Sequence, residues 1–323
     1  MELYYSFTWF LALVALLAFL FEYMDSSLGM GYGTSLTPIL LIMGYESYQI
    51  VPAVLLSEFV TGLVSAGFHT LFKNMTLGVN KTPQSTKLLN TGNIGTSPSS
   101  GILVATEGVS VEEKESNKSR MKELTTDSKV VIVLVLFGVL GTLIATIISA
   151  YYSYSSVFKF GLKIYIGIMV LLMGVLILVF RNRKMKFSFK RIILLGAYAG
   201  FNKGVSGGGY GPVCVSGQIL SGREGRNAIA STSLSEGVIC FVGVVTTLVI
   251  NIIVSHKTTG IVDIGDWGLA PYLMIGAVLS TPLAALTTKK VENRWLKFIV
   301  GIFTVVLGLF TLTKSILNFT GLW

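Results

Sequence analysis

Charged residues are scarce in this sequence. Asp, Glu, Lys and Arg make up 13% of its 323 residues, whereas a soluble domain carries about 25%. Because hydrophobic residues make up 52%, the composition excludes a soluble enzyme or a soluble nucleic-acid-binding protein and predicts a polytopic membrane protein. The net charge of +9 comes from basic residues between apolar segments, where they set orientation and contact anionic lipid headgroups.

Residues that carry catalysis or hold metal ions are also few. The sequence has two cysteines, Cys214 and Cys240, both in apolar segments and without metal-ligand spacing, which predicts small buried hydrophobic residues. His69, near the end of an apolar segment, is predicted to be a hydrogen-bonded residue between helices, with a proton relay as the alternative. The sequence contains no P-loop, HExxH zinc site or nucleophile elbow. We therefore expect no enzyme, no cofactor, no metal and no ATP-driven transport.

Ten apolar segments cover most of the chain and predict an all-α integral membrane protein. Crossing a membrane takes about 20 apolar residues. The second and seventh segments are short and glycine-broken, which is typical of discontinuous helices that line a cavity. The segments are 4–24, 28–44, 48–72, 129–151, 159–180, 190–206, 208–221, 227–251, 267–288 and 295–318.

The basic clusters predict the orientation of these segments. The connection 181–191 carries basic residues and no acid, and 289–297 carries four basic residues against Glu292. Both are expected on the cytoplasmic side. Ten crossings of the cell membrane then place both termini outside and the polar segment 73–128 inside.

The crossings divide into two repeats of about five segments each. The first repeat comprises 1–72 and 129–180, and the second comprises 190–318. Because five is an odd number, the two repeats are predicted to be inverted relative to one another. The segment 73–128 is rich in Ser, Thr, Asn, Gly, Lys and Glu, a composition that predicts a mobile loop.

A sequence repeat supports this division. Residues 29–58 lie over 207–236 without gaps, with nine identities in thirty positions. Both copies place glycines and an acid in strongly apolar sequence, which is typical of secondary transporters with broken helices. The identical pairs are Gly29/Gly207, Gly31/Gly209, Tyr32/Tyr210, Gly33/Gly211, Gly44/Gly222, Glu46/Glu224, Leu56/Leu234, Ser57/Ser235 and Glu58/Glu236.

Glu58 and Glu236 are the predicted proton-coupling residues. Each lies about ten residues, or about 15 Å, into a span, close to the middle of a core about 30 Å thick. An ionised carboxylate there is costly and is usually paired, protonated or wet. Structural hydrogen bonding between helices is the alternative.

The glycine breaks are predicted to bind an anion. Glycines let backbone N–H groups approach a ligand, and a helix beginning after the break directs its positive end at a negative charge. Close helix packing is the alternative. Lys203, aligned with Asp25, is either an electrostatic anchor or a snorkelling interfacial lysine. The predicted substrate-binding residues are Gly29, Gly31, Tyr32, Gly33, Ser57, Lys203, Gly207, Gly208, Gly209, Tyr210, Gly211 and Ser235.

These motifs resemble the sulfite exporter family TauE/SafE. The resemblance lies in Ala199–Gly209 and Asn227–Ser235, and in the first half in Leu28–Gly33 and Val51–Glu58. It implies export or uptake of sulfite or related organic anions without ATP. The chain departs from the family pattern at Met30, where a third glycine is usual, and in its long cytoplasmic loop.

The expected function is a permease for a small anion (sulfite, an organosulfonate or a related organic anion) that works by alternating access with proton coupling. The alternatives are a cation or metal permease and a membrane sensor or assembly protein whose output is the long loop. The expected partners are the anion and membrane lipid, with no nucleic acid. A homo-oligomer is compatible with the sequence.

Overall fold

The fold is all-α, as predicted. The computed structural model describes residues 2–78, 124–152, 155–180, 188–221, 223–259, 264–288 and 294–320, and these contain ten α-helices and no strand. The central part of the predicted loop 73–128 lies outside the described residues. The helices are α1 (Glu2–Leu28), α2 (Tyr32–Ile42), α3 (Ser47–Leu71), α5 (Thr126–Tyr152), α6 (Ser156–Phe180), α7 (Phe189–Ser206), α8 (Tyr210–Leu220), α9 (Gly225–Thr259), α10 (Ala270–Thr288) and α11 (Arg294–Thr320).

The two predicted broken helices are short. Helices α2 and α8 have 11 residues each, and both follow glycines with positive φ: 70° at Gly29 and 138° at Gly31, then 71° at Gly207 and 83° at Gly209. Side chains rarely adopt this left-handed region, so glycine allows each chain to leave one helix and start another within three residues. Seven other helices of the described chain are long and apolar enough to cross a membrane.

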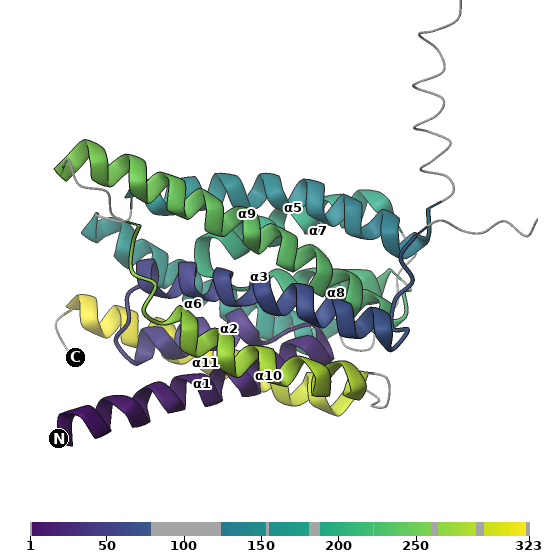
Figure 1. The fold of residues 1–323 in the computed structure, drawn as a ribbon, viewed down its shortest axis with the longest axis horizontal. Helices are drawn as coiled ribbons and strands as arrows, with labels where there is room; N and C mark the ends of the chain where they lie inside the picture. Colours follow the sequence, from purple (N-terminus) through teal and green to yellow (C-terminus); the bar gives the residue numbers. More distant parts are fainter. Residues whose placement is uncertain are drawn as a thin grey trace, which may run out of the picture.

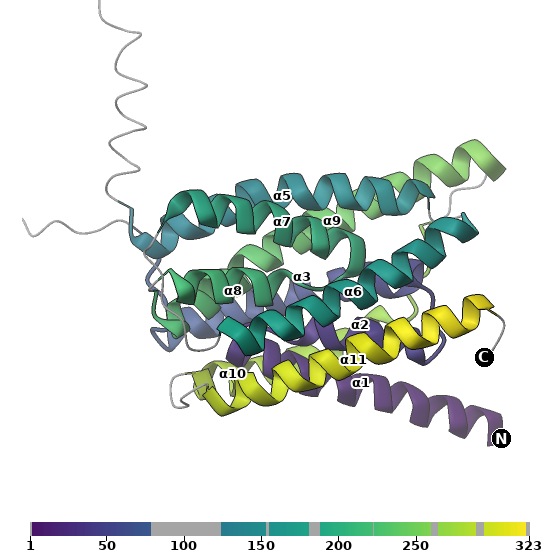
Figure 2. The same ribbon diagram turned by 180° about the vertical axis from the view of Figure 1, so that it is seen from behind.

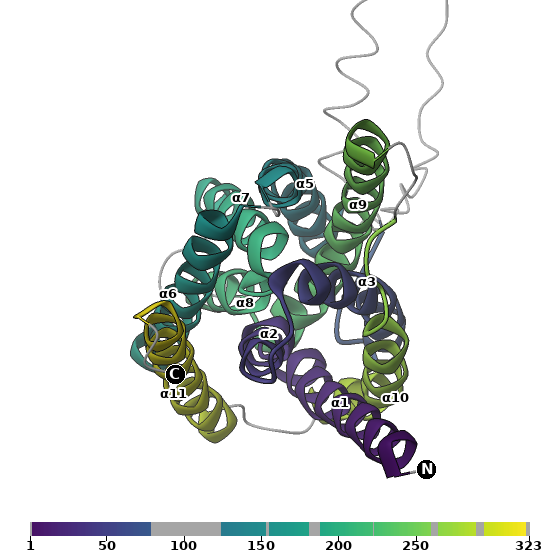
Figure 3. The same cartoon turned by 90° about the vertical axis from the view of Figure 1, so that its left-hand side faces the viewer.

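Both chain termini lie at the same end of the helix bundle (Figure 1). We call this the terminal end, and the opposite end, where α3 ends and α5 begins, the loop end. Helices α2 and α8 occupy the middle of the bundle, surrounded by the long helices (Figure 3). The short helices therefore lie where a solute pathway through the bundle would run.

The long helices pack in pairs that draw on both halves of the sequence. Helix α1 packs on α10 and α7 packs on α5, while α3 lies along α9 and α6 along α11; the last pair is clear from behind (Figure 2). Their outer faces are apolar, with Leu136, Ile144 and Leu279 at least half exposed. Such faces suit contact with acyl chains.

Candidate functional site

The two glycine breaks cross in the centre of the bundle. A Cβ atom on Gly33 would collide with the backbone of Gly207 and Gly208, and one on Gly211 would collide with the backbone of Gly29. Only glycine permits this approach. The crossing brings together the N-termini of α2 and α8, whose unsatisfied N–H groups and dipoles favour negative charge.

The predicted tyrosines and serines form one hydrogen bond in each half. The Tyr32 hydroxyl and the Ser57 hydroxyl are 2.8 Å apart, and the Tyr210 hydroxyl donates to Ser235 over 3.0 Å. All four side chains are fully buried. These bonds join each short helix to the long helix that follows it, so the repeated residues set the position of both N-termini.

Lys203 lies between the two predicted acids. Its Nζ donates to Glu236 Oε1 over 2.7 Å and also contacts Glu58 Oε2. Lys203 is completely buried and belongs to the last turn of α7, next to the break. The snorkelling alternative is therefore wrong, because a snorkelling side chain keeps its charge in water. A buried ion pair of this kind needs both partners.

Two further acids on α1, for which the sequence predicted no role, lie beside this ion pair. Asp25 Oδ1 accepts a hydrogen bond from the Tyr32 N–H at 3.4 Å, and Glu22 Oε1 accepts one from the Ser26 hydroxyl at 2.6 Å. Both acids are buried. Glu22 could have been found from the sequence, because it is an acid in an otherwise apolar segment, three residues before Asp25.

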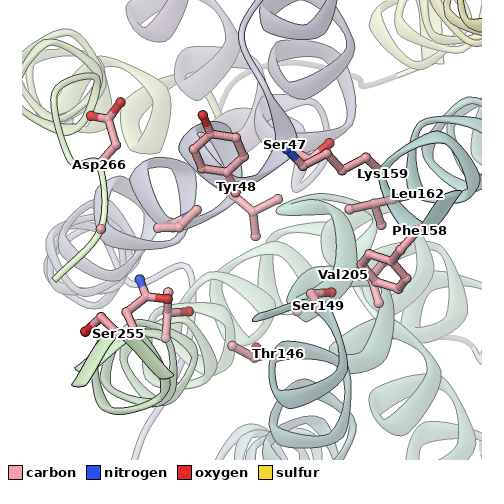
Figure 4. A pocket seen from close by; sticks show the side chains of 16 residues that line it. Ser47, Tyr48, Thr146, Ser149, Phe158, Lys159, Leu162, Val205, Ser255 and Asp266 are labelled. Carbon is pink, nitrogen blue, oxygen red and sulfur yellow. The ribbon is translucent and has the colours of Figure 1, made fainter. Parts of the chain in front are cut away.

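A cavity of about 500 Å³ lies at the terminal end, lined by residues of α3, α5, α6, α7 and α9 and of the connection before α10. Figure 4 shows its lining, which includes Tyr48, Lys159 and Asp266 near the surface and Val205 deeper inside. Val205 and its neighbour Gly204 follow Lys203 directly in α7, so the cavity reaches the backbone next to Lys203, whose side chain is not part of the lining. A small organic anion with water fits this volume.

Hydroxyl groups line the cavity without partners. Within the described residues, the side-chain oxygens of Ser47, Thr146 and Ser149 are buried and lack hydrogen bonds. A buried hydroxyl without a partner costs about 1–3 kcal/mol, so these three have unused hydrogen-bonding capacity beside the cavity. The predicted glycine, tyrosine and serine site residues do not belong to this lining.

At the cavity mouth, hydrogen bonds from the Gly268 N–H and the Gln49 side chain lower the pKa of Asp266. Asp266 is therefore ionised at neutral pH. Lys159, the opposing charge in the lining, lies over the Tyr48 ring at 5.0 Å from its centroid. The mouth thus carries one charge of each sign.

The loop end is closed by polar networks. His69 Nε2 donates to the Ser26 carbonyl over 3.0 Å, and Asn74 Nδ2 donates to His69 Nδ1 over 2.9 Å. Arg223 contacts Asp127 there, and Asn227 donates to the same carboxylate over 3.0 Å. The prediction for His69 is confirmed. From its first residue to its last, α3 thus contacts an accessible cavity, then a buried ion pair and then a closed end of the bundle.

The described side chains include no group of three or more His, Cys, Asp or Glu arranged to hold a metal ion. Cys214 and Cys240 are buried and unbonded to each other, as predicted. The polar groups that the described site presents are carboxylates, one ammonium group, hydroxyls and two helix N-termini.

Comparison with known proteins identifies the family. The profile of the family described as "Sulfite exporter TauE/SafE" matches residues 118–311, more than half of the chain. The chain is also similar to the "Probable membrane transporter protein YtnM" of Bacillus subtilis (strain 168), with 25% identity over 321 residues, covering 94% of this chain and 83% of that protein. The resemblance inferred from the glycine motifs is confirmed. The chain belongs to the TauE/SafE family of membrane transporters.

Proposed function

We propose that this chain is a secondary transporter for a small anion, either sulfite, an organosulfonate or a related organic anion, and that it moves the anion by alternating access with a proton. The observation that carries the proposal is the buried Lys203, held between Glu58 and Glu236 beside the N-terminus of α8. The family description, "Sulfite exporter", supports the choice of anion.

The pairing of Lys203 supports a link between anion and proton. While Glu58 and Glu236 are both ionised, they occupy the ammonium group and repel an approaching anion. Protonation of one of these acids frees an N–H group of Lys203. An anion that enters from the 500 Å³ cavity can then accept a hydrogen bond from this group. The anion then replaces a carboxylate in the ion pair, so the buried charge stays compensated throughout.

The packing of the helices supports alternating access between inverted halves. In their order along each repeat, α1 corresponds to α7, α3 to α9, α5 to α10 and α6 to α11. This correspondence converts the pair α1–α10 into α7–α5, and it maps the pairs α3–α9 and α6–α11 onto themselves. This is the pattern of a pseudo-twofold axis through the crossing of the breaks. Rocking of one half against the other would open the loop end and close the terminal end.

The charges of the two ends support an orientation with both termini outside. Among the described residues, the loop end has more bases than acids: Lys73, Lys129, Lys190, Arg191, Arg223 and Arg226 against Asp127 and Glu224. The terminal end is closer to balance: Lys159, Lys163, Lys257 and Lys314 against Glu46 and Asp266, with Lys163 paired to Glu46 at 3.1 Å. The basic excess at the loop end predicts that it faces the cytoplasm.

Replacing Glu58 or Glu236 with glutamine tests the proton link. Each variant keeps the side-chain volume but cannot release a proton, so we expect flux of sulfite driven by a pH gradient in proteoliposomes to fall at least tenfold. The control is Glu46→Gln, which removes a half-exposed acid at the terminal end. If both glutamine variants fold like the parent and keep its full pH-driven flux, Glu58 and Glu236 do not carry the coupling proton.

Replacing Thr146 with valine tests whether the cavity binds the anion. The change removes an unpartnered buried hydroxyl, so the melting temperature is expected to stay constant or rise. The KM for anion flux is expected to rise several-fold, because the ligand loses a hydrogen-bond partner. A drop in stability with an unchanged KM would instead indicate a structural role.

A cation permease is the second candidate. The surplus of buried acid favours it, because Glu22, Asp25, Glu58 and Glu236 face one lysine. The two candidates differ in ion selectivity. Flux of sulfite, sulfonates, sulfate and carboxylates, compared with flux of sodium and divalent cations in the same proteoliposomes, separates them. Cation flux without anion flux would reject the anion proposal.

A further inference from the structure

Glu22 is a buried acid with one unused oxygen. Its side chain is 3% exposed, and Oε1 accepts the Ser26 hydroxyl. Within the described part of the chain, Oε2 is buried and has no hydrogen-bond partner. An ionised carboxylate in this position would leave an unmatched acceptor and an uncompensated charge inside the membrane, which costs several kcal/mol.

A second unused oxygen lies in the same place. Ser65 on α3 is fully buried, and its hydroxyl also lacks a partner among the described residues. Glu22 and Ser65 both line a small polar cavity of about 10 Å³, together with Asp25, Glu58, Thr61 and Glu236. This cavity has room for one water-sized particle. It is too small and too acidic for the transported anion.

The charges around Glu22 leave it without a direct ionic partner. Lys203 of α7 acts on Glu22 electrostatically, but its direct contacts are with Glu58 of α3 and Glu236 of α9. The remaining titratable groups facing Glu22 are Asp25 of the same helix, Tyr32 of α2 and Cys240 of α9. Lys203 is the one base among these groups and contacts two other carboxylates, so Glu22 has no direct cationic partner within the described residues and a bound proton removes its charge.

The cavity has no counterpart one repeat further along the chain, and it lies on one side of the ion pair. The residues one repeat after Glu22 and Ser65 are Gly200 and Gly243, which have no side chain to build a second such cavity. Ser65 is seven residues closer to the loop end than Glu58, about 10 Å along a helix. The cavity thus lies between the ion pair and the closed loop end.

We propose that Glu22 binds a proton through Oε2 in this cavity, with Ser65 and one water as its neighbours, and exchanges it between the loop end and the Glu58–Lys203–Glu236 ion pair. This role rests on the proposed function, since it names the residue that supplies the coupling proton. In the conformation described here Glu22 is neutral. On opening of the loop end it releases the proton to water as a carboxylate and hydronium.

Infrared spectroscopy of the purified, reconstituted protein tests proton occupancy without any anion. At neutral pH the parent is expected to show the carbonyl band of a protonated, buried carboxyl group, and Glu22→Gln is expected to lose it. Glu22→Asp, which retains a carboxyl group, keeps a band at a shifted frequency. The control Glu46→Gln leaves the parent spectrum unchanged. A Glu22→Gln spectrum that keeps the full band would overturn the proposal.

Transport assays then test the coupling. Glu22→Gln is expected to keep the exchange of sulfite between equal concentrations on the two sides of the membrane. The factor by which a pH gradient accelerates sulfite flux is expected to fall at least tenfold. If sulfite and the other anions are not transported by the parent, the proposed function fails, while the infrared result on Glu22 still stands or falls separately. If sodium in place of choline restores or drives flux in the parent, and Glu22→Gln abolishes that effect, the bound cation is sodium and the proton proposal is overturned.

Discussion

Replacement of Lys203 with methionine is expected to abolish anion flux and to lower the free energy of unfolding by about 3–5 kcal/mol, the usual result of breaking a buried ion pair on one side. Methionine fills a similar volume, so the loss does not arise from a cavity. It arises because Glu58 and Glu236 lose the ammonium group that both of them contact. Thermal unfolding in detergent and sulfite flux in proteoliposomes measure the two effects.

A rescue experiment separates the stability effect from the transport effect. Adding Glu58→Gln and Glu236→Gln to Lys203→Met removes the two unpaired charges, and most of the lost stability is expected to return. Flux is expected to remain absent, because the site then has no cation for the anion. A Lys203→Met protein with parental stability and parental flux would show that Lys203 is neither a structural nor a transport residue.

The helices and their breaks follow from local sequence. Apolar length placed the long helices to within a few residues at most ends, and α9 alone runs eight residues past its expected end, from 251 to Thr259. The breaks were predictable because glycines with positive φ leave a signature in sequence. The Tyr–Ser hydrogen bonds follow the repeat as well, since Tyr32 precedes Ser57 by the same 25 residues that separate Tyr210 from Ser235.

The site itself was only partly predictable, because its contacts join distant helices. Lys203, Glu58 and Glu236 were each predictable as site residues, but their pairing depends on how α7 packs against α3 and α9. The acidic cavity depends on the position of α1 against α3, which sets Glu22 beside Ser65. The lining of the larger cavity comes from helix ends without shared spacing or composition. No local pattern contains this information.

The central crossing predicts a large effect for a single methyl group. In Gly208→Ala, the new Cβ would lie 2.6 Å from the Gly33 carbonyl carbon and 2.8 Å from the Thr34 nitrogen. Backbone atoms cannot rotate away as a side chain can, so the cost is expected at the upper end of the overpacking range, about 3 kcal/mol.

The matched control for this substitution is Gly67→Ala. Gly67 is a helical glycine of α3 with no atom within 4 Å of its added Cβ, so the change is expected to leave stability constant or raise it by up to about 1 kcal/mol. Anion flux is also expected to be lower in Gly208→Ala than in Gly67→Ala, because the crossing holds both helix N-termini beside Lys203. If thermal unfolding shows equal stability for the two variants, the breaks do not touch, and the anion site cannot be built from their meeting. Backbone contact at Gly208 is thus the structural requirement on which a shared binding site depends.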